Sequence, residues 1–366
     1  MRNLYFIVLI LYVSYGHNCH ATKTIISSED KYAELEGSTS FSMGHIKNNE
    51  ERFSDGKNGT ILLDSNIGFL YIRKKDSEDN LGAKIKLSTK FTSFKPKPLE
   101  INIDEMHIFF ATQNRGTMKL GFDDTIGRSI GINTSKMYFG AGGINGRWTD
   151  LANLRGFNKA DDGSGYDTGG IFWVKPDLYI DYKGLKSLRV SYYSTKIRGV
   201  QIGLNYLPKD DDAGYQRIVS GGITYSNCAF KNINYSLSLT GELANENSAK
   251  KLNKLQTWNA GLDLQYKNVK YVISYGNIGK SGRKNSPETY YINTGIAYYH
   301  NNWRGSFMHF ISTRGNNNFL SWSINWEKYL AKNASCYIDF VKFNTQESAD
   351  SSNSGHVFLV GLKSNF

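Results

Sequence analysis

Proline, cysteine and long apolar runs are all scarce in this chain. Only 5 of its 366 residues are proline, so few positions would interrupt the hydrogen bonding of extended strands. Beyond residue 21 there is no run of 18 apolar residues, which excludes a transmembrane helix there. The three cysteines, Cys19, Cys228 and Cys336, are widely spaced, and we expect neither a metal site nor a disulfide.

What the chain has instead favours β-structure. It contains 24 Tyr and 20 Phe, which prefer strands, and 36 Gly, which suit turns and close backbone contacts. The mean hydropathy of −0.46 argues against a helical membrane protein, but it is compatible with strands that are polar on one face. The composition therefore predicts an all-β protein.

The first 21 residues have the features of a secretory signal peptide. Arg2 supplies a positive charge, residues 4–13 form a short apolar run, and Ala21 ends a small-residue cleavage site. We therefore predict a signal peptide at 1–21 and one exported domain at 22–366.

Strict alternation of apolar and polar residues marks many strands. In residues 258–266, Trp258, Ala260, Leu262, Leu264 and Tyr266 share one face, and polar residues or glycine occupy the other. A period of two with one apolar face indicates a half-buried strand. In a membrane barrel, the apolar face would contact lipid and the polar face would line a watery lumen.

About sixteen such strands can be placed along the chain. We expect them near residues 33–46, 60–73, 81–91, 103–113, 116–122, 185–195, 200–208, 217–227, 232–243, 256–266, 269–277, 289–299, 303–313, 318–328, 334–344 and 356–366.

The connections between these strands alternate in length. Short joins occur near residues 113–115, 196–198, 267–268 and 300–302, and longer, charged joins lie between them. Short turns at one rim and long loops at the other are typical of an outer-membrane barrel. The sequence therefore predicts a transmembrane antiparallel β-barrel of about 16 strands in the outer membrane of a Gram-negative cell.

One connection, residues 123–184, is far longer than the others. Its aromatic residues, among them Trp148 and Trp173, need a surface to pack on, which argues against disorder. The inner wall of a wide barrel supplies such a surface. We expect this segment to fold inward as a constriction loop.

Four segments resemble the Gram-negative general diffusion porins, especially those of α-proteobacteria. They are a hairpin (64–69 with 78–84), the strand leading into the constriction loop (116–125), a second hairpin (189–208) and the terminal strand (355–366). The sequence departs from the family pattern at three positions: Asn66 and Phe122 replace arginines, and Ser364 replaces an apolar residue. The terminal Phe366 matches the aromatic that the family uses in membrane insertion.

The resemblance implies a homotrimer that passes small hydrophilic solutes and ions by passive diffusion, with no cofactor. An eyelet of this kind needs facing rows of acidic and basic side chains. Alternation turns Lys84, Lys86 and Lys119 toward the lumen, and Arg189 matches the position of an arginine in the family pattern. We predict that these four residues form the basic wall. The acidic side would come from the long segment: Asp150, Asp161, Asp162 and Asp167.

The net charge offers a second indication. Arg2 is the only acidic or basic residue of 1–21, so residues 22–366 carry 43 bases against 33 acids. This excess favours weak anion selectivity, with contact to lipopolysaccharide and other outer-membrane lipid as the second interpretation. Nucleic acid is not an expected partner, because the bases are dispersed and no recognition motif is present.

Two other functions fit a barrel. A surface adhesin or scaffold would have long exposed loops and no inward segment. An outer-membrane enzyme would need clustered catalytic side chains, but His107 and His309 have no such partners in the sequence, and sixteen strands would leave an open channel. The channel is the favoured interpretation, the adhesin or scaffold is the alternative, and the enzyme is less favoured.

Overall fold

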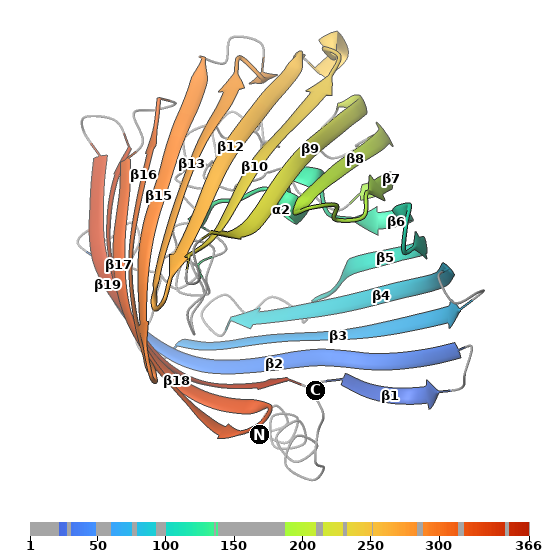
Figure 1. Ribbon diagram of the computed structural model, residues 1–366. Helices are drawn as coiled ribbons and strands as arrows, with labels where there is room; N and C mark the ends of the chain where they lie inside the picture. The colour runs from blue at the N-terminus through green and yellow to red at the C-terminus, as the bar shows by residue number, and fades with distance from the viewer. Residues whose placement is uncertain are drawn as a thin grey trace.

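A computed structural model describes residues 22–27, 31–48, 60–74, 79–92, 100–134, 137, 187–209, 215–229, 233–250, 252–283, 288–313, 318–347 and 351–365. Within them, one antiparallel sheet of seventeen strands curves around an interior in which the short helix α2 (Ile126–Ile130) lies (Figure 1).

Sixteen of the strands form a closed ring. In chain order they are β2 (Lys31–Asn48), β3 (Thr60–Lys74), β4 (Asp79–Thr92), β5 (Glu100–Thr112), β6 (Gly116–Asp123), β7 (Ser187–Tyr193), β8 (Val200–Lys209), β9 (Gln216–Ala229), β10 (Ile233–Ala244), β12 (Leu255–Tyr266), β13 (Val269–Gly279), β15 (Thr289–His300), β16 (Trp303–Ser312), β17 (Asn318–Ala331), β18 (Ala334–Glu347) and β19 (Ser351–Asn365).

The ring closes where β19 pairs with β2. This ladder runs from Gly355 opposite Asn48 to Asn365 opposite Ser38. The seventeenth strand, β1 (Thr22–Ser27), continues along the same edge of β2, with Thr22 opposite Glu36. Closure matters in a membrane because lipid offers no hydrogen bonds to an open sheet edge. The predicted closed barrel of sixteen strands is confirmed.

The connections sort by length between the two rims. The turns at residues 113–115, 267–268, 301–302 and 332–333 join strand ends at one rim, whereas the connections 49–59, 124–186 and 245–254 join strand ends at the other. The loop at 245–254 contains a 3-10 turn (η6, Ser248–Lys250) and a two-residue strand, β11 (Leu252–Asn253). β11 pairs with β14 (Gly282–Arg283) from the next long loop. The predicted alternation of short and long connections is therefore present.

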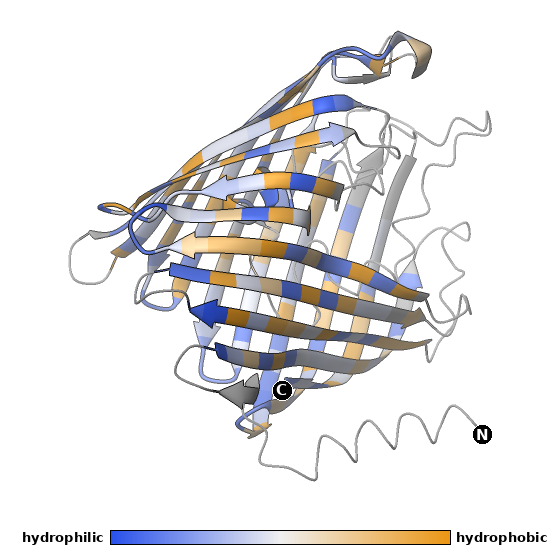
Figure 2. Cartoon of the chain, turned by 90° about the vertical axis from the view of Figure 1, so that its right-hand side faces the viewer, coloured by the Kyte–Doolittle hydropathy of each residue, from blue (hydrophilic) through white to orange (hydrophobic). Residues whose placement is uncertain are grey.

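Hydrophilic and hydrophobic residues alternate along many strands of the wall, seen as blue and orange bands (Figure 2). On β12, Trp258 is 40% exposed on the outer face, whereas its neighbours Thr257 and Asn259 are buried on the inner face. Exposed Ile, Leu and aromatic side chains recur on the outer face of the ring. This is the pattern of a barrel surrounded by lipid.

Five elements were not predicted: β1, η6, β11, β14 and α2. The two-residue strands are too short to show a period, and α2 makes a single turn after Asp123, where the sequence predicts only a loop. Several strands also run one to three residues further than expected, because backbone pairing continues past the last residue of the apolar pattern. No helix among the described residues is long and apolar enough to cross a membrane.

Candidate functional site

The inner wall carries charged side chains in pairs rather than in separate rows. Lys84, on β4, points to the inner face, and its Nζ lies 3.1 Å from Glu36 Oε1 and 3.2 Å from Glu105 Oε2. Glu105 comes from the neighbouring strand β5, and Glu36 comes from β2, two strands away. The predicted base is therefore present, but two wall carboxylates compensate its charge.

A glycine on β3 makes the contact between Glu36 and Lys84 possible. Gly68 on β3 lies between Glu36 and Lys86 in the strand registers. A Cβ at Gly68 would be 2.9 Å from both Cγ and Oε1 of Glu36, so only glycine leaves room for this side chain to cross β3 toward Lys84. Lys86 lies beside Gly68 on the next strand, which is consistent with its predicted inward position.

Lys119 is also paired on the wall. Its Nζ lies 3.0 Å from Asp123 Oδ2 on the same face of β6, and 5.3 Å from the ring centre of Tyr193. Asp123 is buried, and Tyr193 Oη is 3.0 Å from Ser129 Oγ of α2. These contacts connect the predicted basic residue to the beginning of the long segment.

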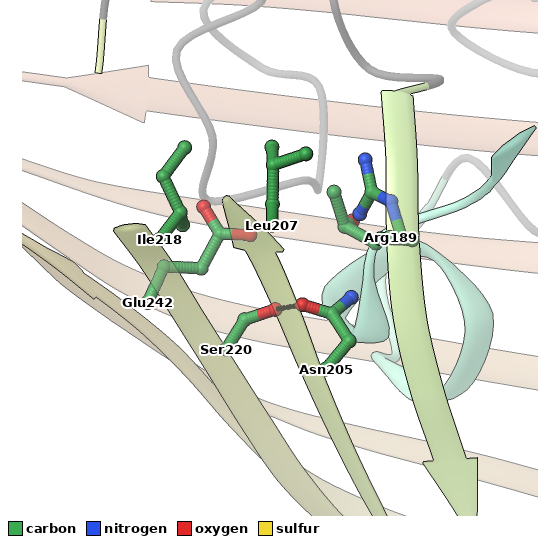
Figure 3. A pocket seen from close by; sticks show the side chains of 7 residues that line it. Arg189, Asn205, Leu207, Ile218, Ser220 and Glu242 are labelled. Carbon is green, nitrogen blue, oxygen red and sulfur yellow. Dashed lines mark hydrogen bonds between the residues drawn. The ribbon is translucent and has the colours of Figure 1, made fainter. Parts of the chain in front are cut away.

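Arg189 is the most enclosed of the predicted basic residues. It is only 3% exposed and lines a small pocket between α2 and the wall, together with Asn205, Ser220 and Glu242 (Figure 3). Ser220 Oγ lies 2.5 Å from Asn205 Oδ1 within this polar group. Arg189 therefore faces inward as expected, but it is shielded from the open lumen.

The beginning of the long segment is attached to the inner wall. Thr125 caps α2 by accepting a hydrogen bond from the Arg128 amide at 3.2 Å. Further along, the Ile132 amide donates to Ser238 Oγ at 2.9 Å, and Thr134 Oγ1 donates to Asn293 Oδ1 at 2.8 Å. The expectation that this segment enters the barrel therefore holds for its described part, residues 124–134 and 137.

Glycines on the wall leave space for this attachment. A Cβ at Gly203 or Gly222 would meet the Ile126 side chain at 3.0 and 3.1 Å, respectively. A Cβ at Gly261 would lie 2.4 Å from the carbonyl oxygen of Ile132, and one at Gly295 would lie 2.7 Å from Met137 Sδ. The four glycines belong to β8, β9, β12 and β15, so they form a shallow track around the lumen.

The predicted acidic residues of the segment lie outside the described residues. These are Asp150, Asp161, Asp162 and Asp167, and the terminal Phe366 also falls outside. Their roles remain predictions.

Two features of the inner wall escaped the sequence analysis. Further ion pairs join Lys270 to Asp263 at 2.9 Å and Arg304 to Glu327 at 2.5 Å. Large apolar side chains also lie on the inner face near the loop rim, among them Phe310 and Phe319, which stand directly opposite each other and are almost fully buried. Alternation places each residue on a face, but it does not show which residues of other strands lie beside it.

The described residues contain no group of His, Cys, Asp or Glu suited to a metal ion. His309, which was weighed as a catalytic residue, contacts Asn318 at 3.0 Å and lies on the same face as Phe307 and Ile311, both exposed on the outer wall. His107 is buried on the inner face, and its ring lies at a tilt to that of Phe109, with ring centres 6.1 Å apart. These contacts form no nucleophile–base arrangement.

Comparison with known proteins agrees with this architecture. The chain is 23% identical to an uncharacterized protein of Rickettsia bellii (strain RML369-C), over 94% of this chain and 95% of that protein. The fold is similar to that of Salmonella typhi OmpF in complex with daunomycin, with a TM-score of 0.64, 11% identity, and coverage of 94% of this chain and 100% of that one. It is also similar to the trimer form of OmpT, an outer membrane protein of Vibrio cholerae, with a TM-score of 0.57, 11% identity, and coverage of 92% and 100%.

A family model settles the classification. Residues 24–348, most of the chain, match the model described as Gram-negative porin. The closed sixteen-strand wall, polar inside and apolar outside, has the architecture that this family requires. The chain belongs to the Gram-negative porin family, and it is an outer-membrane channel protein rather than an enzyme.

Proposed function

We propose that small hydrophilic solutes and ions cross this channel by passive diffusion, and that segment 123–184 narrows it. The observation that carries the proposal is the attachment of the described start of this segment to the inner wall through Ser238, Asn293 and the glycine track. Paired charges and hydroxyl groups on the same wall would replace part of the hydration shell of a passing solute.

Single-channel recording in planar bilayers tests both parts of this proposal. The refolded protein is expected to give stable conductance steps, and deletion of residues 140–167 is expected to raise the conductance because it removes material from the lumen. Stable steps with no change on deletion would refute the constriction but leave the channel. A folded protein without any steps would favour the adhesin or scaffold.

We further propose a homotrimer, with the sector β2 to β6 facing the other protomers. Among the described residues, the exposed Trp and Tyr side chains of the outer wall all lie on β7 to β17, whereas the exposed apolar residues of β2 to β6 are Ile, Leu, Met and Phe. Trp and Tyr girdles mark surfaces that meet lipid headgroups. The outer face of this sector also holds a hydrogen bond between Thr39 and Ser65, at 2.9 Å. Chemical cross-linking of the protein in membranes would show a trimer if this is correct.

We infer that the protein is of the α-proteobacterial porin type and that residues 1–21 are removed on export. The motif resemblance and the Rickettsia relative support the first inference. For the second, the first strand of the sheet begins at Thr22, directly after the predicted cleavage site. The mass of the protein isolated from outer membranes tests the cleavage, since retention of the leader would add 21 residues.

A further inference from the structure

A row of basic side chains crosses the outer wall near the loop rim. The strand registers place Lys342 of β18 opposite His356 of β19, and His356 opposite Lys47 of β2. All three occupy outward positions, since they alternate with buried inner residues such as Val341 and Val357. Both lysines are exposed, and neither forms an ion pair with a residue that the structure describes.

The row lies at the upper border of the apolar band. On the side of the short turns, the next outward residues are Phe358 on β19 and its partner His45 on β2. Met43 follows His45 on β2, and Phe358 and Met43 are 41% and 48% exposed. Toward the long loops, the next outward residues of β18 and β19 are Asn344 and Ser354, which pair with each other. A change from apolar to polar on the outer wall marks the level of the lipid headgroups.

Aromatic rings lie beside this row of basic residues on the outer wall. His356 stacks on Phe340 with ring centres 5.8 Å apart, and Phe340 packs against Trp322 at 5.3 Å. Trp322 stands directly opposite Lys342. Basic and aromatic side chains are therefore side by side where a lipid offers both a charged headgroup and acyl chains.

The spacing suits a single phosphate group. Adjacent strands are about 4.8 Å apart, so the backbones of Lys47 and Lys342 are separated by about 10 Å, and their long side chains can converge above His356. Two ammonium groups and an imidazole N–H would then surround one phosphate with hydrogen-bond donors.

We propose that Lys47, His356 and Lys342 bind a phosphate on the diglucosamine headgroup of lipopolysaccharide. The inference rests on the proposed outer-membrane channel, because the long loops of such barrels face the cell exterior and the short turns face the periplasm. On that side the leaflet consists of lipopolysaccharide, whose headgroup carries phosphate. The row lies at the border of the sector β2 to β6, where a lipid can fill the seam between protomers.

Lipid binding to the folded, detergent-solubilised protein tests the site. Native mass spectrometry would measure binding of diphosphoryl lipid A, with phosphatidylglycerol as the second anionic lipid. We expect the double variant Lys47→Gln/Lys342→Gln to bind diphosphoryl lipid A about tenfold more weakly, because each basic residue contributes strongly at a charged lipid surface. Lys267→Gln/Lys328→Gln removes two exposed lysines at the opposite rim and is expected to bind like the unaltered protein.

Three outcomes would overturn the proposal: unchanged binding in the first variant, equal losses in both variants, or an equal loss of phosphatidylglycerol binding, which would indicate general surface attraction. Conductance serves as a separate readout. The first variant should keep the unaltered conductance because its changes lie outside the barrel, so failure of the lipid site and failure of the channel are distinguishable.

Discussion

Replacing Lys84 by glutamine is expected to shift the channel about threefold toward cations in its permeability ratio. The change leaves Glu36 and Glu105 on the inner wall without the ammonium group that now lies 3.1 and 3.2 Å from them. In water, the Coulomb interaction energy between one unit charge and an ion about 8 Å away is about 0.5 kcal/mol. The energy has opposite sign for cations and anions. At about 0.1 M salt the screening length is about 10 Å, so an ion about 8 Å away still feels part of the charge.

The reversal potential in a planar bilayer under a KCl gradient measures this shift. Lys328→Gln is the matched control, because Lys328 lies on the same face of β17 as the outward Trp326 and should leave selectivity unaltered. An unshifted reversal potential in Lys84→Gln would mean that ions do not pass near this cluster. The same measurement on the unaltered protein tests the weak anion selectivity that the net charge favours, and cation selectivity would refute it.

Replacing Gly261 by valine is expected to displace the beginning of the constriction segment. Even the first added carbon would lie 2.4 Å from the carbonyl oxygen of Ile132 and 2.8 Å from its Cβ, which is closer than atoms can pack. Overpacking of this kind costs about 1–3 kcal/mol. Ile132 would be pushed away from the wall and into the lumen, so we expect a lower single-channel conductance and a lower unfolding temperature.

Gly305→Val provides a control with the same chemical change. Gly305 lies on β16, and a Cβ there would have only the Ser323 carbonyl oxygen near it, at 4.0 Å. This variant should keep both the conductance and the unfolding temperature. If Gly261→Val also kept both, the contact with Ile132 would not hold the segment in place.

Much of the fold was predictable because each strand shows a pattern among residues that are close in the sequence. The side-chain period of two, the scarcity of proline and the alternating loop lengths all depend on near neighbours in the chain, and they predicted the sixteen-strand barrel. The inward positions of Lys84 and Lys119 followed from the same alternation. The charge balance around them did not, because Glu36 reaches Lys84 from two strands away, across Gly68.

The inner wall shows the same limit in two other places. Arg189 was expected to line the pore, but it is only 3% exposed and shares a small pocket with Thr125, just before α2, and with residues of β8 to β10. The aromatic pair Phe310 and Phe319 lies on a face that alternation assigns to water. In both cases the environment depends on segments that come together only when the barrel closes.

By itself, the sequence determined that the chain forms a barrel wall and which face of each strand meets lipid, because both depend on contacts between residues close in sequence. Only the tertiary structure decided which charges neutralise each other, which glycines receive the inward segment, and that Lys342, His356 and Lys47 form one row. Those relations depend on strand register, and register is set by the pairing of distant segments around a closed ring.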